Sequence, residues 1–590
     1  MDQQSTVREP GTWSRRPRPV TLVAAILGVV PFALHTWAAL RGGFAQDDFL
    51  ITYRAAAAGP FELDYLFQDY QGHLAPGVFL VAGVMTFLAP LNHAVMTVPL
   101  LLVQAAASVL FWLVLVRCFG RRWAILVPFA VFTTSTLLLV PTLWWAYAIQ
   151  ILPVLLAAVG ALHAHAGYLR DGRRGQLVAS AVWTVVGLAF YEKAALIPVL
   201  VLGMTVLVGA PLRRYRLVWL CQGGLLALYA LVYLLLTSSQ VRNGTAERSV
   251  VGVLELFRRM VVDTLLPGLV GGPWSGPGAG ATWASPPAEV RAILVFFTLA
   301  VLAWGVRAGG RRAWRAWALL GVAVVVDVAL VAVTRFSEVG PALGNDPRYV
   351  ADIVLVAAFC GAFAFLRPVL LATEPEDVPA KRERPVALGL SAALLLSSVV
   401  GFQQLAPALR FDHASRYIDN ARAAVAGDPE LILFDAPVPS DIVHEWFAEN
   451  SRASRVVGLV PGIRFDTPTS RMHLLDDSGR PQRITGVDPI AVSVPGPVEG
   501  CGNPVADILV RIPLDMAVLG RYLLRVDYYT AAGGEGFVDR DGFRTPVWFQ
   551  EGLHSIYLPV EGLFDKIGVQ LASKGAPVCI AKLYVGKPTT

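Results

Sequence analysis

The sequence predicts a polytopic α-helical membrane protein with about eleven transmembrane helices and a polar, extracytoplasmic C-terminal region. Of its 590 residues, 55% are hydrophobic and only 16% are charged, and the mean hydropathy is +0.56. Soluble globular chains rarely have this balance. Apolar runs fill residues 20–404, whereas short alternating segments with glycine-rich turns follow. We therefore expect a cytoplasmic tail, a transmembrane domain, an α/β segment and a β-sandwich of jelly-roll type, at residues 1–19, 20–404, 405–488 and 489–590.

The first apolar run, Val20 to Leu40, is long enough to span a bilayer. Arg15, Arg16 and Arg18 precede it, so the positive-inside rule places the N-terminus in the cytoplasm. No small-residue cleavage site follows the run, which indicates a retained helix rather than a removed signal peptide.

The basic residues determine the predicted topology. Five Lys/Arg clusters separate the apolar runs, and all five can be cytoplasmic only if the short run at 76–91, which starts at Pro76, does not span. We therefore expect 76–91 to be a juxtamembrane or re-entrant helix on the outer face. The clusters are Arg117/Arg121/Arg122, Arg170/Arg173/Arg174, Arg213/Arg214/Arg216, Arg307/Arg311/Arg312/Arg315 and Lys381/Arg382/Arg384.

Eleven spans then remain, and they place the Gly/Pro/Trp-rich loop 238–289 and residues 405–590 outside. The first outer loop contains 54–68, which is either an interfacial helix or a plain loop. The predicted spans are 20–40, 97–116, 123–141, 145–168, 176–190, 194–210, 217–237, 290–306, 315–333, 347–366 and 385–404.

The C-terminal region reads as two kinds of structure. Helices at 416–426 and 441–450 and strands at 431–435 and 456–460 predict a small α/β element. The β-sandwich is predicted from strand-like runs at 507–512, 522–529, 546–550, 555–559, 566–571 and 578–585.

The five cysteines fall into two groups. Cys501 and Cys579 lie in the polar C-terminal part and can form a disulfide if this part faces an oxidising exterior. Cys118, Cys221 and Cys360 lie in or beside hydrophobic runs, and we expect them to be inert core thiols.

Polar residues from distant segments collect on the predicted outer face. Ionised groups at membrane depth are costly and therefore indicate a functional site, although Asp47 and Asp48 could also be a solvated pair at a helix exit. Carboxylates can act as general bases, and Lys and Arg can stabilise charge on a leaving phosphate. These residues are Asp47, Asp48, His73, Tyr191, Glu192, Lys193, Arg335, Glu338, Asp346, Arg348 and Tyr349.

Four local motifs resemble those of the type C glycosyltransferases (GT-C), closest to the branch of the protein O-mannosyltransferases and lipid A aminoarabinose transferases. Asp47-Asp48 resembles an acidic pair after helix one, and Gly72-His73-Leu74-Ala75-Pro76 resembles a His/Lys-Pro-Pro element. Residues 187–194 resemble a Gly-Leu-x-x-x-x-Lys-Gly element, and Pro347-Arg348-Tyr349 resembles an Arg-Tyr that opens a late helix. The resemblance covers residues 20–370. Asp48, Ala75 and Ala194 depart from the commoner Glu, Pro and Gly.

The resemblance implies an inverting transfer of a sugar from a polyprenyl phosphate to a hydroxyl of a cell-wall glycan, lipid or protein. It makes the transmembrane domain catalytic and Asp47 the general base. Asp48 would bind the acceptor, ligate a metal or replace Asp47 as the base. Lys193 and Arg348, with Arg335 and Tyr349, would contact the lipid phosphate, while His73 and Glu192 would position donor or acceptor.

Each of these functional roles has a purely structural alternative. Lys193 could snorkel or pair with Glu192, Arg348 could anchor the interface beside Tyr349, and His73 could form a helix-start hydrogen bond. A transporter, flippase or polymerase for lipid-linked glycans is the alternative function, but Asp327 is the only clear midspan acid and no half-repeat is visible. A non-catalytic assembly subunit is a further alternative.

The expected partners are the bilayer, the lipid-linked donor and the acceptor, and no nucleic acid. The net charge of +6 arises from arginines that mark topology. No residue spacing indicates a metal site, although a divalent cation at Asp47/Asp48 stays open, and no Gly-rich loop indicates a nucleotide. The Arg-, Ala-, Gly- and Val-rich composition is typical of a high-GC bacterium, so we expect a bacterial plasma membrane location.

Overall fold

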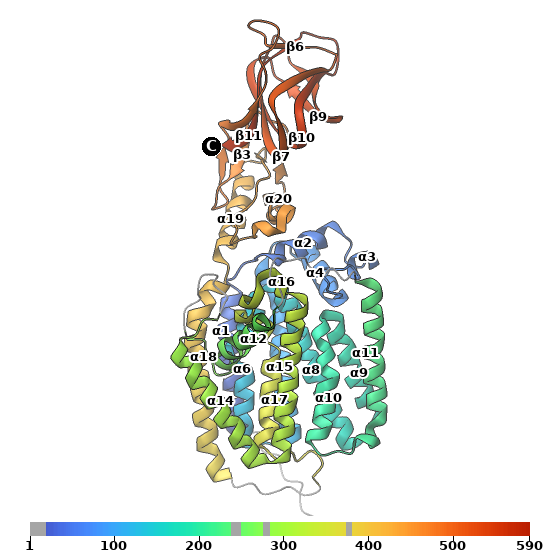
Figure 1. The fold of residues 1–590 in the computed structure, drawn as a ribbon, viewed down its shortest axis with the longest axis vertical. Coiled ribbons are helices and arrows are strands. Elements are labelled where there is room, and N and C mark those ends of the chain that lie inside the picture. The colour runs from blue at the N-terminus through green and yellow to red at the C-terminus, as the bar shows by residue number, and fades with distance from the viewer. Residues whose placement is uncertain (1–18, 238–248, 275–283, 373–379) are drawn as a thin grey trace, which may run out of the picture. The chain divides into compact units, whose positions relative to one another are not determined.

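A computed structural model describes residues 19–237, 249–274, 284–372 and 380–590. The chain divides into two compact units. The helical unit comprises Met1–Gly42, Pro60–Ala82 and Ala94–Arg410, and the C-terminal unit comprises Gly43–Gly59, Gly83–His93 and Phe411–Thr590. Figure 1 shows the helices of the first and the strands of the second. Arg15, Arg16 and Arg18 lie outside the described residues.

The helical unit is that of a multi-pass membrane protein. Within the described residues, eight helices are long and apolar enough to cross a bilayer. They include α1 (Pro19–Ala39), α5 (His93–Phe119), α8 (Trp145–Asp171), α11 (Arg216–Leu236), α14 (Ala288–Gly309), α15 (Arg311–Thr334) and α18 (Ala380–Leu409). The eighth is the segment Trp123–Leu143, which contains α6 (Leu126–Thr134) and α7 (Leu139–Leu143).

The other three predicted spans are also apolar helices, but they are shorter. They are α9 (Arg174–Phe190), α10 (Leu196–Leu207) and α17 (Ile353–Phe365). The run predicted not to span forms α4 (Pro76–Leu88). Every predicted span therefore contains a helix.

Side-chain burial separates central helices from peripheral ones. Helix α8 is mostly buried and packs against α7, α9 and α10, whereas α11 and α14 expose apolar side chains such as Leu234 and Phe296. Helices α8 and α9 approach closely at Gly160, where a Cβ would lie 2.5 Å from the ring of Trp183. The exposed apolar faces are suited to lipid.

Two predictions for the outer loops are wrong in detail. The segment 54–68 is not one helix: α2 (Asp47–Ala57) ends within it, and the short α3 (Leu63–Leu66) follows a bend. The predicted loop 238–289 contains α12 (Val250–Arg258), a π-helical turn η5 (Arg259–Leu265) and α13 (Leu266–Leu269), while 238–248 and 275–283 lie outside the described residues.

The five basic clusters lie at one end of the helical unit. Arg117 Nη1 donates to the carbonyl of His163, and Tyr215 Oη donates to that of Leu169, so the ends of α5, α8 and α11 meet. Arg122 pairs with Glu383, and Arg384 stacks on Trp123. Arg312 Nε donates to the carbonyl of Phe363 at 2.7 Å. This hydrogen bond places the fourth cluster beside the C-terminal end of α17. A common end is what the predicted topology requires.

We expect this end to be cytoplasmic and the C-terminus to be outside. The measurement is a pair of reporters fused after Thr590, one active only outside the cytoplasm and one active only inside. Activity of the outside reporter alone is the expected result. Activity of the inside reporter alone would contradict the assigned topology.

The first part of the C-terminal unit is a small α/β element. Helix α19 (Asp412–Gly427) covers the predicted helix 416–426, and β1 (Ile432–Leu433) lies in the predicted strand 431–435. The sheet has the order β2-β1-β3-β4, and β1 is parallel to both β2 (Arg464–Phe465) and β3 (Met472–Leu475). Strand β4 (Pro481–Arg483) adds the antiparallel edge. Val425, Leu431 and Leu433 form its core beneath α19.

Two elements of this segment differ from the prediction. The predicted helix 441–450 is a turn followed by the 3₁₀ helix η8 (Glu445–Ser451), whose Ala448 has φ 50°. The predicted strand 456–460 is wrong: α20 (Ala453–Val456) and a turn stand there. Asp435 accepts hydrogen bonds from the backbone N–H and the hydroxyl of Ser454 at 2.7 and 2.8 Å, which fixes the first turn of α20.

The rest of the unit is a seven-stranded sheet in the order β5-β11-β7-β10-β8-β9, with β6 paired to β11. The predicted pairs 507–512/522–529 and 555–559/566–571 are each one long strand. The reason is that the chain bends without breaking at Gly520 and Gly562, which face each other, and at a bulge after Phe564. The strands are β5 (Gly486–Val492), β6 (Asn503–Val505), β7 (Val510–Thr530), β8 (Gly534–Arg540), β9 (Phe543–Phe549), β10 (Gly552–Leu571) and β11 (Val578–Thr589).

A disulfide joins Cys501 to Cys579, as predicted. It connects the segment before β6 to β11 across 78 residues of sequence. Cys118 and Cys360 are buried as expected, but Cys221 is exposed on α11, because that helix lies at the periphery of its unit.

Replacing both Cys501 and Cys579 by Ser is expected to destabilise the C-terminal unit. Losing a cross-link that closes a loop of this length costs about 4 kcal/mol in the chain-entropy model. The free energy of unfolding from denaturant titration measures the loss, and Cys221→Ser is the control that should leave it unchanged. Equal stability of the double variant and the wild type would contradict the assigned role.

Candidate functional site

The acidic pair begins α2 in the C-terminal unit. Asp48 is fully buried, and its Oδ2 accepts a hydrogen bond from the backbone N–H of Ala45 at 2.8 Å. The hydroxyl of Thr52 donates to the Asp48 carbonyl one turn later. Asp47 is only partly buried. This geometry makes Asp48 the residue that holds the start of α2 and leaves Asp47 as the better candidate for contact with a substrate.

Residues of the helical unit form three connected polar groups. In the first, His73 bridges two others: its Nδ1 lies 2.7 Å from Glu192 Oε1, and its Nε2 lies 2.8 Å from Arg335 Nη2. Because an arginine can only donate, Nε2 must accept, and the hydrogen on Nδ1 then points to Glu192. Arg335 also pairs with Glu338 at 3.1 Å. His73 is therefore held as one neutral tautomer.

Charges determine the protonation of this first group. Burial favours the neutral form of Glu192, but the hydrogen bond from His73 and the charge of Arg335 favour the carboxylate and lower the pKa of that carboxyl. Burial works against the charge of Arg335 too, yet Glu338 raises the pKa of the guanidinium. Both Glu192 and Arg335 are thus ionised at neutral pH.

The second group surrounds Lys193 in η3 (Glu192–Ala195), the short turn between α9 and α10. Its Nζ lies 2.8 Å from Asp352 Oδ1, 3.1 Å from Asp327 Oδ2 and 3.0 Å from the carbonyl of Tyr349. Burial opposes the charge on Lys193, but the two carboxylates raise the pKa of the ammonium well above its usual value. The ammonium donates hydrogen bonds to Asp352 and to the Tyr349 carbonyl and forms an ion pair with Asp327, so contact with a phosphate, which stays a prediction, requires it to leave one of these partners.

Gly187 explains why Lys193 can reach this position. A Cβ on Gly187 would lie 2.8 Å from Ile197 and 2.9 Å from the Cβ of Ala194. The glycine therefore lets the end of α9 approach the turn that carries Lys193. The spacing of Gly187 and Lys193 in the sequence motif is thus a packing requirement.

The third group surrounds Arg348 in η7 (Pro347–Tyr349). Arg348 pairs with Asp346 at 2.9 Å and donates to Tyr349 Oη at 3.1 Å. Its guanidinium lies 4.9 Å from the ring centres of both Trp144 and Tyr349. Burial raises the pKa of Asp346, and the charge of Arg348 opposes this. The side chain of Arg348 remains 27% exposed, which makes it the most accessible of the three predicted cations.

The structure joins most of the predicted site residues and adds three that the sequence analysis did not assign. His73, Glu192 and Arg335 form one group, and Tyr349 links Lys193 to Arg348. Asp352 was missed although it follows Tyr349 by three residues, and Asp346 was noted without a partner. Asp327 was recognised as a midspan acid, but its partner Lys193 is remote in sequence. The described residues contain no group of three or more side chains suited to a metal ion.

A further ionic cluster, which the sequence did not predict, follows α11. Glu255 binds both Arg258 and Arg259 at 2.7 Å, and Asp263 binds Arg258 at 3.1 Å and Arg291 at 3.4 Å. The doublet Arg258-Arg259 in a predicted outer loop was the available signal. Each of these arginines has a carboxylate partner, so the cluster serves to hold α12 and η5 in place.

No protein-family model matches the sequence, and no curated protein matches it either. Among solved structures, the chain is similar to ArnT from Cupriavidus metallidurans, in the apo state and bound to undecaprenyl phosphate. The identity is 15% and the TM-score 0.41, over 78% of this chain and 94% of that one. It is also similar to the arabinofuranosyltransferase AftD from Mycobacteria, with 13% identity, a TM-score of 0.39, and coverage of 96% of this chain and 58% of that one. At TM-scores below 0.5, the function has to be inferred from the residues themselves.

Proposed function

We propose that this protein is a membrane glycosyltransferase of the type C kind, which moves a sugar from a polyprenyl phosphate to a hydroxyl group outside the cytoplasm. The observation that supports the proposal is the convergence of Lys193, from the turn after α9, with Arg335 and Arg348, from the connection between α15 and α17, in linked polar groups of the helical unit. Such a set of cations is suited to an anionic leaving group.

Each cation has its own part in the proposed reaction. Arg348 is held between two aromatic rings and oriented by Asp346, so its guanidinium is preorganised to donate to phosphate oxygens. Arg335 is oriented by His73 and Glu338. Lys193 holds Asp327 and Asp352 and keeps the turn of Tyr349 in place.

The proposed chemical step is a single displacement. The acceptor oxygen attacks the anomeric carbon, the bond from that carbon to the phosphate oxygen breaks, and the hydroxyl proton passes to Asp47. The polyprenyl phosphate leaves as an anion, and Arg348 and Arg335 stabilise its growing charge. Attack opposite to the leaving group inverts the anomeric configuration. The acceptor is a cell-wall glycan, a lipid or a protein.

The transporter alternative predicts charges midway along helices, and the only clear midspan acid in the sequence, Asp327, gives it no support. Asp327 is a midspan residue of α15, but its Oδ2 pairs with Lys193, so packing explains its presence. A transfer assay separates the two functions. We expect purified protein in lipid vesicles to transfer sugar from a synthetic polyprenyl-phosphate sugar and not from a nucleotide sugar.

Replacing Arg348 by Ala should weaken donor binding on the order of tenfold to a hundredfold, because a charge-assisted hydrogen bond to the phosphate is lost. Arg214→Ala is the control, since Arg214 also stacks on a tyrosine, at the end with the basic clusters. Movement of a lipid-linked glycan across the vesicle without transfer would instead identify a flippase.

A further inference from the structure

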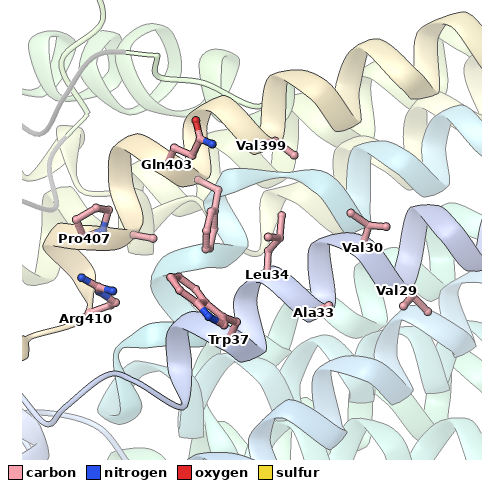
Figure 2. Close-up of a pocket in the computed structure, with 11 residues that line it drawn as sticks. Val29, Val30, Ala33, Leu34, Trp37, Val399, Gln403, Pro407 and Arg410 are labelled. Atoms are coloured by element: carbon pink, nitrogen blue, oxygen red, sulfur yellow. The ribbon is translucent and has the colours of Figure 1, made fainter.

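A groove of about 660 Å³ runs along the outside of the helical unit between α1 and α18. Figure 2 shows its residues, with Val29 and Val30 toward one end and Trp37, Pro407 and Arg410 toward the other. None of the residues that line it is acidic, and none belongs to the three polar groups described above. The groove is therefore a separate feature.

The groove changes character along its length. Its inner part lies beside the middle of α1 and α18 and is lined by aliphatic side chains such as Val29, Ala33 and Val399. Val29 is 62% exposed, so these side chains face a hydrocarbon environment. Its outer part contains Trp37, whose ring packs at a tilt against that of Phe402, with 6.5 Å between ring centres. Aromatic side chains of this kind favour the membrane interface.

Two cations stand at the aromatic end. Arg410 lines the groove where α18 has ended, and the guanidinium of Arg41 lies 4.6 Å from the ring centre of Trp37, just after α1. An apolar groove that begins at the level of the acyl chains and ends at Arg410, with Arg41 against the ring of its Trp37, matches one molecule of the surrounding leaflet: a hydrocarbon tail with a phosphate head.

We propose that this groove binds one anionic phospholipid, with a tail along α1 and α18 and the phosphate at Arg41 and Arg410. The site is distinct from the proposed donor site and does not depend on the glycosyltransferase function. It fixes the lipid at the point where the chain leaves both helices toward the C-terminal unit, at Gly43 and Phe411.

The test is native mass spectrometry of the full-length protein titrated with phosphatidylglycerol or phosphatidylcholine. We expect one tightly bound phosphatidylglycerol per chain and no equivalent phosphatidylcholine. The double substitution Arg41→Gln/Arg410→Gln should weaken this binding on the order of tenfold to a hundredfold, since it removes both arginines that attract the anionic head group.

Two further variants make the test specific. Arg384→Gln is the matched control, because Arg384 also stacks on a tryptophan, at 5.0 Å from the ring centre of Trp123, but lies at the opposite end of α18. It should retain the lipid. Ala33→Phe fills the groove from an exposed position and should lose it while thermal stability is kept.

Three results would overturn the proposal. Equal binding of both lipids would show that the arginines do not select the head group. Displacement of phosphatidylglycerol by millimolar inorganic phosphate would identify a simple anion site. A wild-type dimer that Ala33→Phe dissociates would show that a second copy of the chain fills the groove.

Discussion

Replacing Asp47 by Asn is expected to lower the rate of sugar transfer on the order of 100- to 10,000-fold while donor binding is retained. Asparagine keeps the shape of the side chain but cannot accept the proton of the acceptor hydroxyl. The cations assigned to the phosphate all belong to the helical unit, whereas Asp47 belongs to α2 in the C-terminal unit, so the substitution leaves them intact. Single-turnover rates and separate donor-binding measurements on the purified protein provide the test.

Asp48 is the matched control for this experiment. Its carboxylate accepts the N–H of Ala45, so Asp48→Ala should cost about 1 kcal/mol of stability, as for the loss of a helix cap, with a smaller loss of turnover. If Asp47→Asn keeps near wild-type turnover and Asp48→Asn is inactive, the base is Asp48. If both asparagine variants remain active, the proposed mechanism is wrong.

Replacing Lys193 by Met is expected to destabilise the helical unit by about 3–5 kcal/mol, because it leaves two buried carboxylates without their cation. Asp327 and Asp352 each lie within 3.1 Å of Nζ, and the ammonium side chain is only 5% exposed. Unfolding in mixed detergent micelles measures the loss. Adding Asp327→Asn to the Lys193→Met variant should recover part of the stability, because it removes one of the stranded charges.

Arg170→Met is the control for the lysine variant. Arg170 pairs with Asp171, but its side chain is 50% exposed, so its loss should cost less than about 1 kcal/mol. A Lys193→Met protein with wild-type stability and abolished donor binding would show that Lys193 contacts the phosphate directly and does not act as an anchor.

The membrane part of the fold could be predicted because hydropathy and the positive-inside rule depend on local composition. The fold of the C-terminal unit was harder to predict from the sequence. The valines at 456–460 have high strand propensity, yet Asp435, remote from them in sequence, caps α20 through Ser454 and determines a helical turn. The length of β7 and β10 was missed because the strand-like pattern is interrupted around Gly520 and Gly562, where the structure bends the paired strands without ending them.

In the candidate site, too, local sequence predicts some features and distant contacts determine the others. The polar residues could be collected on one face from topology alone, but their partners depend on how helices pack. Glu192 was a candidate partner for its neighbour Lys193, whereas the structure pairs it with His73, and Lys193 with Asp327 and Asp352. Adjacent residues in a tight turn point in different directions, so only the packed helices reveal which charges meet.

The register of the β domain also determines the order in which its strands can meet during folding. Gly552 of β10 pairs with Thr530 of β7, close in sequence, whereas Thr589 of β11 pairs with Gly486 of β5, at the far edge. Since closing a long loop costs entropy before any contact is gained, we expect the β7–β10 ribbon to form first and the β5–β11 edge last. Pulse-labelling hydrogen exchange should then protect Leu524 amides before those of Ala491. Simultaneous protection would exclude this order.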